Sequence, residues 1–70
     1  MERFGEKLRI LRQRKGLTVR QLGAMLGVSG PYVVQMEQGY KVPNAAMIIK
    51  IARLFKVSTD QLMLDELELD

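Results

Sequence analysis

Short polar residues that cap helices recur along this chain of 70 residues, each placed between apolar residues. Thr18 lies after Leu17, and Gln21 follows three residues later, which is the reciprocal pattern of a capping box. The same pattern of a cap and an apolar partner begins at three further residues: Ser29, Asn44 and Ser58. With the apolar spacing between the caps, it predicts five helices over residues 2–15, 18–26, 29–37, 44–55 and 58–65. The fold class is therefore all-α, with one small core.

A turn of only three residues, 27–29, joins the second and third of these helices. Two helices joined this tightly cross steeply, at about 90–120°, in the geometry of a helix-turn-helix. Gly23 would let the third helix approach closely, and Gly27 permits a left-handed turn. The residues expected to seal the inner angle are Leu22, Leu26, Val28, Val33 and Met36. Those of the fourth helix expected in the core are Ala45, Ile48, Ile51, Ala52 and Phe55.

The composition excludes most kinds of catalytic and metal site. The chain has no Cys and no His, so it lacks thiol nucleophiles, disulfides and the commonest metal ligand and general base. We therefore expect neither an enzyme nor a bound cofactor or metal. No apolar run approaches the length of about 18 residues that a membrane helix requires. The expected location is the cytoplasm, without contact to a membrane.

The charge is unevenly distributed along the chain. The formal net charge is +3, but four acidic residues fall in the segment 65–70. Residues 1–64 therefore carry eleven basic and four acidic side chains, a net charge of +7. A basic body suits a polyanion such as nucleic acid, although a well-solvated surface would have the same balance. The acidic segment is expected to be a disordered, solubilising tail; a partner-binding element or an electrostatic competitor of DNA are the alternatives.

The order of these motifs resembles the phage repressor and Cro-like helix-turn-helix family, also called the xenobiotic-response-element type, over residues 2–64. The matching positions are Leu8, Leu11, Arg12, residues 15–18, Leu22, residues 26–29, Met36, Glu37, Gly39, Pro43, Ile51, Ala52, Val57, Ser58 and Leu62. The resemblance implies a five-helix, lambda-repressor-like DNA-binding domain over residues 1–64, followed by the short acidic tail 65–70.

The resemblance further implies that the helix over residues 29–37 enters the major groove of double-stranded DNA. The residues that would face the bases are Ser29, Gly30, Pro31, Tyr32, Val34 and Gln35. Gly30 and Pro31 depart from the polar readers common in the family, so direct readout would be thin and DNA shape would supply much of the specificity. Gln35 could pair with adenine, and Val34 could touch a thymine methyl. Simple helix initiation is the alternative explanation of Gly30 and Pro31.

The family commonly has Gln at the start of the second helix as a phosphate contact, where this chain has Val19. The phosphate partners expected around the rim are Arg12, Thr18, Arg20, Gln21, Gln38, Tyr40, Lys41 and Asn44. In the family, the positions of Arg12 and Glu37 form a partly buried ion pair, and we expect the same here.

The family generally works as homodimers on near-palindromic operators. The residues expected at the dimer interface are Met47, Leu54, Met63 and Leu64, in an apolar patch that also includes Ile49. Partial burial within a monomer is the alternative explanation of these apolar residues. The leading hypothesis is thus a transcriptional regulator of the repressor type that acts by occupying its operator, with RNA polymerase as a further partner. The alternative is a protein-interaction module, such as an antitoxin bound to a toxin-like partner or a controller protein of a restriction-modification system.

Overall fold

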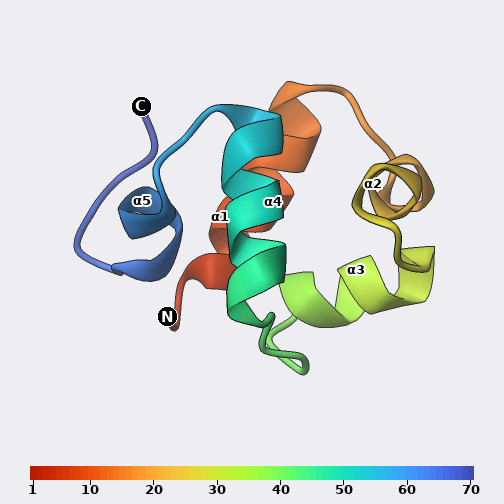
Figure 1. The fold of residues 1–70 in the computed structure, drawn as a ribbon, viewed down its shortest axis with the longest axis horizontal. Helices are drawn as coiled ribbons and strands as arrows, with labels where there is room; N and C mark the ends of the chain where they lie inside the picture. Colours follow the sequence, from red (N-terminus) through yellow and green to blue (C-terminus); the bar gives the residue numbers. More distant parts are fainter.

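The computed structural model describes all 70 residues and consists of five helices without strands. The helices are α1 (Phe4–Arg14), α2 (Val19–Leu26), α3 (Gly30–Glu37), α4 (Ala45–Phe55) and α5 (Thr59–Met63). In Figure 1, α2 and α3 lie on one side of α4, and α5 lies on the other side together with both chain ends. The expected all-α, five-helix fold is confirmed. None of the helices is both long and apolar enough to cross a membrane.

The predicted caps start the last four helices. The Oγ1 atom of Thr18 accepts from the backbone N–H of Gln21 at 3.0 Å, and the Gln21 side chain accepts from the N–H of Thr18 at 2.9 Å. Ser58 and Gln61 repeat this reciprocal arrangement. Ser29 and Asn44 each accept one backbone N–H three residues on. An N-cap typically contributes about 1 kcal/mol to the stability of its helix, so these short helices begin at residues that the local sequence determines.

Twelve apolar residues form one buried cluster. Its members are Phe4, Leu8, Leu11, Leu22, Leu26, Val33, Met36, Ile48, Ile51, Ala52, Phe55 and Leu62. Val28 is half-buried against this cluster. The prediction that Ala45 belongs to the core is wrong, because it is exposed. Ala45 is the first residue of α4, where the helix has only begun to pass over the core.

The turn between α2 and α3 depends on two glycines. Gly27 ends α2 with φ +78°, in the left-handed region that favours glycine. A Cβ atom on Gly23 would lie 2.6 Å from the carbonyl oxygen of Val28, so only glycine permits the turn to fold back this closely. The N–H of Val28 donates to the carbonyl of Gly23 at 2.8 Å. The steep crossing predicted from the short turn therefore rests on a close backbone contact.

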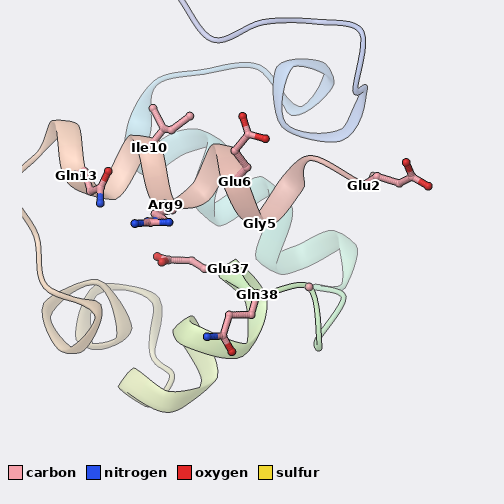
Figure 2. A pocket seen from close by; sticks show the side chains of 9 residues that line it. Glu2, Gly5, Glu6, Arg9, Ile10, Gln13, Glu37 and Gln38 are labelled. Atoms are coloured by element: carbon pink, nitrogen blue, oxygen red, sulfur yellow. The ribbon is translucent and has the colours of Figure 1, made fainter.

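A third glycine sets the position of α1 on the end of α3. A Cβ atom on Gly5 would lie 2.3 Å from the carbonyl oxygen of Glu37 and 2.7 Å from that of Met36. Figure 2 shows the two helices meeting there, with Gly5 above the last residues of α3. This contact could not be predicted from the sequence, because a glycine inside a helix looks merely unfavourable until its neighbour is known.

The C-terminal segment, residues 64–70, is not the disordered tail that we expected. The helix α5 ends at Met63, two residues before the predicted end at 65, and the backbone of Leu64 is extended. The carboxylate of Asp65 accepts from the backbone N–H groups of Glu2 and Arg3, at 3.1 and 2.9 Å. Leu69 is half-buried against the core. The segment therefore returns across α1 and packs on the domain.

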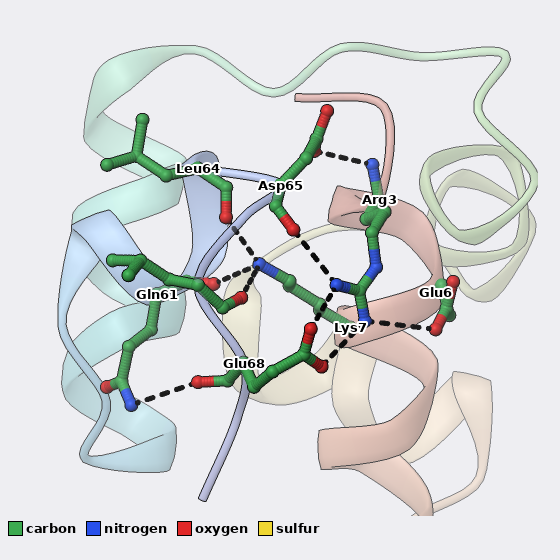
Figure 3. Close-up of polar contacts among 8 residues, drawn as sticks. Arg3, Glu6, Lys7, Gln61, Leu64, Asp65 and Glu68 are labelled. Atoms are coloured by element: carbon green, nitrogen blue, oxygen red, sulfur yellow. Dashed lines mark hydrogen bonds and ion pairs between the residues drawn. The ribbon is translucent and has the colours of Figure 1, made fainter.

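Lys7, on α1, holds this return in place. Its side chain is completely buried, and its ammonium group donates to three backbone carbonyl groups. These belong to Gln61, Leu64 and Leu67, at 2.6, 2.7 and 2.6 Å (Figure 3). An ammonium has three donors, so all of them are used, and carbonyls left free at the end of α5 gain a partner.

Arg3 forms the outer part of the same junction. Its guanidinium contacts the Glu68 carboxylate at 2.7 and 3.1 Å and the Asp65 carbonyl at 2.9 Å. The hydrogen bond from the backbone of Arg3 holds the pKa of Asp65 below its ordinary value. The hydrogen bond from the Arg3 side chain likewise lowers the pKa of Glu68. We call Arg3, Lys7, Asp65 and Glu68 the terminal junction.

Candidate nucleic-acid interface

The outer side of α3 carries the residues predicted to face DNA bases. Ser29 and Pro31 are exposed, as is Gln35, whereas Gly30 and Val34 are half-buried. Tyr32 is half-buried and packs against the core, so only part of its ring is available to a ligand. Val33 and Met36 lie inside the core, as predicted. The helix thus divides cleanly between an inner and an outer side.

An open groove of about 580 Å³ runs between the start of α2 and the outer side of α3. It is lined by Val19, Arg20, Gly30, Pro31, Val34 and Gln35. Four of these six are among the residues predicted to face the bases, and the other two are the first residues of α2. A Cβ atom on Gly30 would meet the Cα atom of Arg20 at 3.4 Å, an ordinary contact. Gly30 therefore faces α2 at the bottom of this groove.

The residues predicted to contact phosphates surround this face. Seven of the eight are exposed: Thr18, Arg20, Gln21, Gln38, Tyr40, Lys41 and Asn44. Thr18, Gln21 and Asn44 also use their side-chain oxygens as helix caps. The N–H groups of Tyr40 and Lys41 both donate to the carbonyl of Gln35, at 2.9 and 3.2 Å. These two bonds tie the loop after α3 to the end of that helix.

The eighth residue, Arg12, is mostly buried in an ion pair with Glu37, as predicted. Its Nε and Nη2 atoms donate to the two carboxylate oxygens at 2.7 and 3.1 Å, and Nη1 donates to the carbonyl of Leu17 at 2.9 Å. The exposed fractions of the two side chains are 15% and 8%. The hydrogen bonds to Glu37 raise the pKa of Arg12. One N–H remains on each of Nη1 and Nη2 for a further acceptor.

A second hollow, of about 440 Å³, lies between α1 and the end of α3. Figure 2 shows its charged lining, which includes Glu2 before α1, Glu6 and Arg9 on α1, and Glu37 on α3. Three of these four side chains are carboxylates. This hollow therefore differs in charge from the groove between α2 and α3, which has no carboxylate in its lining.

Comparison with known proteins shows the family to which this chain belongs. The sequence model of a helix-turn-helix family matches residues 8–62 of this chain. The chain belongs to this helix-turn-helix family. The HTH-type transcriptional repressor RghR of Bacillus subtilis is 44% identical over 64 residues, which cover 90% of this chain and 47% of the repressor. The chain thus spans about half the length of that relative.

Two solved structures share the fold of this helix-turn-helix domain. The P22 c2 repressor, crystallised with a synthetic operator, superposes with a TM-score of 0.83 at 27% identity, over 90% of this chain and 96% of that one. The restriction-modification controller protein C.AhdI from Aeromonas hydrophila gives a TM-score of 0.76 at 31% identity, over 87% of this chain and 88% of its own. The predicted resemblance and the lambda-repressor-like fold are both confirmed.

An apolar surface lies on α4 and α5, away from the helix-turn-helix. Of the four predicted dimer residues, Met63 and Leu64 are 38% and 41% exposed, whereas Met47 and Leu54 are half-buried against the core. Ile49, which also belongs to the predicted apolar patch, is 44% exposed. It lines a shallow hollow with Met63, together with Ala45, Ile48 and Thr59.

The terminal junction was not predicted from the sequence. Lys7 lies one position before Leu8 on the apolar side of α1, and a lysine there is usually solvated. Its partners lie 54 to 60 residues away in the sequence. The one available signal was that Lys7 follows Phe4 by three residues, which places both on the same helical face.

Proposed function

We propose that this chain is the DNA-binding domain of a transcriptional regulator and places α3 in the major groove of double-stranded DNA. The observation that carries the proposal is the open face formed by α2 and α3, which has no carboxylate in its groove and is surrounded by exposed polar side chains. An α-helix fits the major groove, and direct contacts to base edges would come from Gln35 and neighbouring residues.

The start of α2 supports a contact to the phosphate backbone. The N–H groups of Val19 and Arg20 are in the first turn and have no partner within the helix. A helix N-terminus attracts anions through these groups and its partial positive charge. The Arg20 side chain adds a full charge at the same place. The net charge of +7 on residues 1–64 favours the same partner.

We further propose that two copies act together on a near-palindromic operator. The exposed apolar side chains of Ile49, Met63 and Leu64 would form the centre of a two-fold interface. Bound in this way, the regulator would repress by occupancy, excluding RNA polymerase from the promoter. The domain acts by binding and performs no catalysis.

Selection of bound duplexes from a random pool tests the DNA-binding proposal. We expect an enriched inverted repeat whose half-sites lie about one helical turn, 34 Å, apart. The affinity for that duplex should fall steeply with salt, as about the sixth to ninth power for 6–10 phosphate contacts. No enriched sequence, together with a flat salt dependence, would contradict the proposal and favour an interaction module that binds another protein.

A matched pair of variants locates the interface. Replacing Gln35 by Ala should weaken binding to the selected duplex about tenfold, the typical value of a bidentate base contact. Replacing Gln13, which is also exposed but lies on α1, by Ala should change the affinity less than twofold. Equal losses in the two variants would argue against α3 as the reading helix.

Sedimentation at micromolar concentration tests the dimer. The unaltered chain should sediment as a dimer, and Ile49→Lys as a monomer with weaker operator binding. Val42→Lys is the control, since Val42 is 77% exposed and lies in the loop before α4. A strict monomer for the unaltered chain, both free and on DNA, would refute the interface.

A further inference from the structure

The C-terminal segment turns back on itself directly after α5. The N–H of Leu67 donates to the carbonyl of Leu64 at 3.1 Å, which closes a turn over residues 64–67. These two leucines are 41% and 38% exposed, for Leu64 and Leu67 respectively. Leu69, two residues beyond the turn, instead packs against the core. The turn therefore presents two leucine side chains to solvent from a segment that is otherwise attached to the domain.

Lys7 holds both ends of this turn. Its ammonium donates to the carbonyl of Leu64 at 2.7 Å and to that of Leu67 at 2.6 Å. A third bond, to the carbonyl of Gln61 at 2.6 Å, joins the turn to α5. Figure 3 shows the Leu64 carbonyl directed at the ammonium and the Leu64 side chain directed away from it. The bonds from Lys7 therefore fix the backbone in an orientation that keeps this side chain outside.

The turn continues the apolar surface of α4 and α5. Leu64 directly follows Met63, the last residue of α5, which is 38% exposed and lines a hollow with Ile49 of α4. Leu67 adds a fourth exposed apolar side chain at the other end of the turn. Exposed apolar side chains that lie together mark an interaction surface. In the proposed function, the partner of this surface is a second copy of the chain.

The acidic residues of the same segment would oppose such a contact if they were unpaired. A two-fold interface brings a patch against its own copy, so equal charges meet across it. Here the carboxylate of Asp65 is bound by the backbone N–H groups of Glu2 and Arg3. The carboxylate of Glu68 is bound by the guanidinium of Arg3 at 2.7 Å. The terminal junction thus occupies two carboxylates beside the turn and leaves its leucines free.

We propose that the turn 64–67 is part of the two-fold interface between copies of this chain, and that Lys7 is the positioning residue that holds the turn in shape. The inference rests on the proposed dimer and specifies what controls it. Lys7 touches no partner, because its side chain is completely buried. It acts through the backbone of the turn, so the cost of ordering the turn is met when the domain folds and not when two copies associate.

Sedimentation equilibrium of Lys7→Met measures this coupling, at a temperature where thermal unfolding shows the variant to be folded. Methionine removes the three donors, so the turn must be ordered during association. Fixing the backbone of one residue corresponds to about tenfold in an equilibrium constant, and we expect the dimer dissociation constant to rise by about that factor. An unchanged dissociation constant would overturn the proposal.

Lys50→Met is the matched control for this measurement. Lys50 donates to the carbonyl of Leu26, at the end of α2, and makes no contact with the turn. Its loss should leave the dimer dissociation constant within twofold of that of the unaltered chain. Equal weakening of the dimer in the two lysine variants would refute a specific role of Lys7.

Duplexes of two kinds separate positioning from a general loss of structure. A duplex with one half-site binds a single copy, whereas the full operator binds two. Lys7→Met should bind the half-site within twofold of the unaltered chain and the full operator about tenfold more weakly. Equal losses on the two duplexes would mean that the DNA-binding face itself is altered, and the positioning role would be refuted.

Leu67→Lys tests the turn without removing any contact of the junction. The Leu67 side chain is exposed, and only its backbone carbonyl contacts Lys7. The variant should keep its melting temperature and raise the dimer dissociation constant about tenfold, because a charge replaces an apolar group in the interface. Val42→Lys, at a residue that is 77% exposed before α4, should change neither quantity. A Leu67→Lys dimer as tight as that of the unaltered chain would exclude the turn from the interface.

These outcomes are separable from failure of the proposed function. An unaltered chain that is monomeric, both free and on DNA, contradicts the proposed dimer and this inference with it. A dimer that is insensitive to both Lys7→Met and Leu67→Lys leaves the proposed function intact and refutes only the role of the turn and of Lys7.

Discussion

The terminal junction lies on one side of α4, and the open face formed by α2 and α3 lies on the other (Figure 1). Polar groups are paired within the chain at the junction, whereas at the face polar groups lack partners and apolar side chains are exposed. At the junction, Lys7 uses all three donors on backbone carbonyls, and Arg3 is paired with Glu68. At the face, Val34 and Pro31 remain in contact with water, and the first N–H groups of α2 lack partners. At the junction, groups within the chain satisfy one another, whereas the groups at the face are free to contact a ligand.

The difference indicates that a chain of this size uses one set of residues to stabilise the fold and another set to bind. Small domains have few residues with which to form a core, so the contacts that close the fold must be nearly complete. No buried side-chain nitrogen or oxygen in the protein lacks a hydrogen-bond partner. Unpaired groups are confined to the surface. We therefore expect changes at the junction to alter stability and changes at the face to alter binding.

The largest effect should come from Glu37→Ala, which breaks the ion pair that joins α1 to the end of α3. It leaves the guanidinium of Arg12 without its buried partner, and breaking such a pair typically costs about 3–5 kcal/mol. Thermal unfolding should show a large fall in melting temperature, and operator binding should weaken with it. Native-like thermal stability in this variant would refute the importance of the pair.

The next effect, confined to the junction, should come from Lys7→Met. Methionine keeps the apolar stem but removes a donor from three carbonyls, of which that of Leu64 still accepts from the N–H of Leu67, and we expect a cost of about 3 kcal/mol. Urea unfolding measures the loss. Lys50→Met is the matched control, because Lys50 is exposed and makes one hydrogen bond, to the carbonyl of Leu26 at 3.1 Å. Equal stability of the two variants would show that the carbonyl contacts of Lys7 contribute little.

Gly23→Ala should distort the turn between α2 and α3 and leave the terminal junction unchanged. The added Cβ would lie 2.6 Å from the carbonyl oxygen of Val28, so the turn must move away from α2, at a cost of about 1–3 kcal/mol. Gly30→Ala is the control, since its Cβ would make only an ordinary contact at 3.4 Å. Chemical denaturation compares the two. A Gly23→Ala variant as stable as Gly30→Ala would contradict the close approach.

The smallest effect should be the pH dependence of the junction. The pKa of Asp65 is lowered in the folded state, so its contribution to stability is present above its unfolded pKa of about 4 and is lost as pH falls through the folded value. Asp65→Asn should therefore be less stable than the unaltered chain at pH 7, with a difference that shrinks towards pH 3. Melting temperatures across that range measure it. A constant difference would mean that Asp65 contributes no charge-dependent stability.

The features predicted best from the sequence are those that depend only on residues close together in the chain. The caps at Thr18 and Ser58 need only a Gln three residues away, so their helices could be placed from local pattern, as could the turn at Gly27. The junction could not be predicted, because Lys7 and the carbonyl of Leu67 are 60 residues apart and meet only after α5 has packed. The requirement for glycine at residue 5 likewise becomes evident only when the end of α3 packs against it. In the interface, the residues of α3 were predicted individually, but the groove depends on how α2 approaches them.

The most direct test of the account is to measure intermolecular nuclear Overhauser effects between the chain and its selected duplex. The account predicts contacts from DNA protons to the methyl groups of Val19 and Val34, and none to Leu67 or Leu69 in the C-terminal segment. Contacts confined to that segment or to α5, with none from α3, would contradict the claim that the open face between α2 and α3 is the DNA-binding surface.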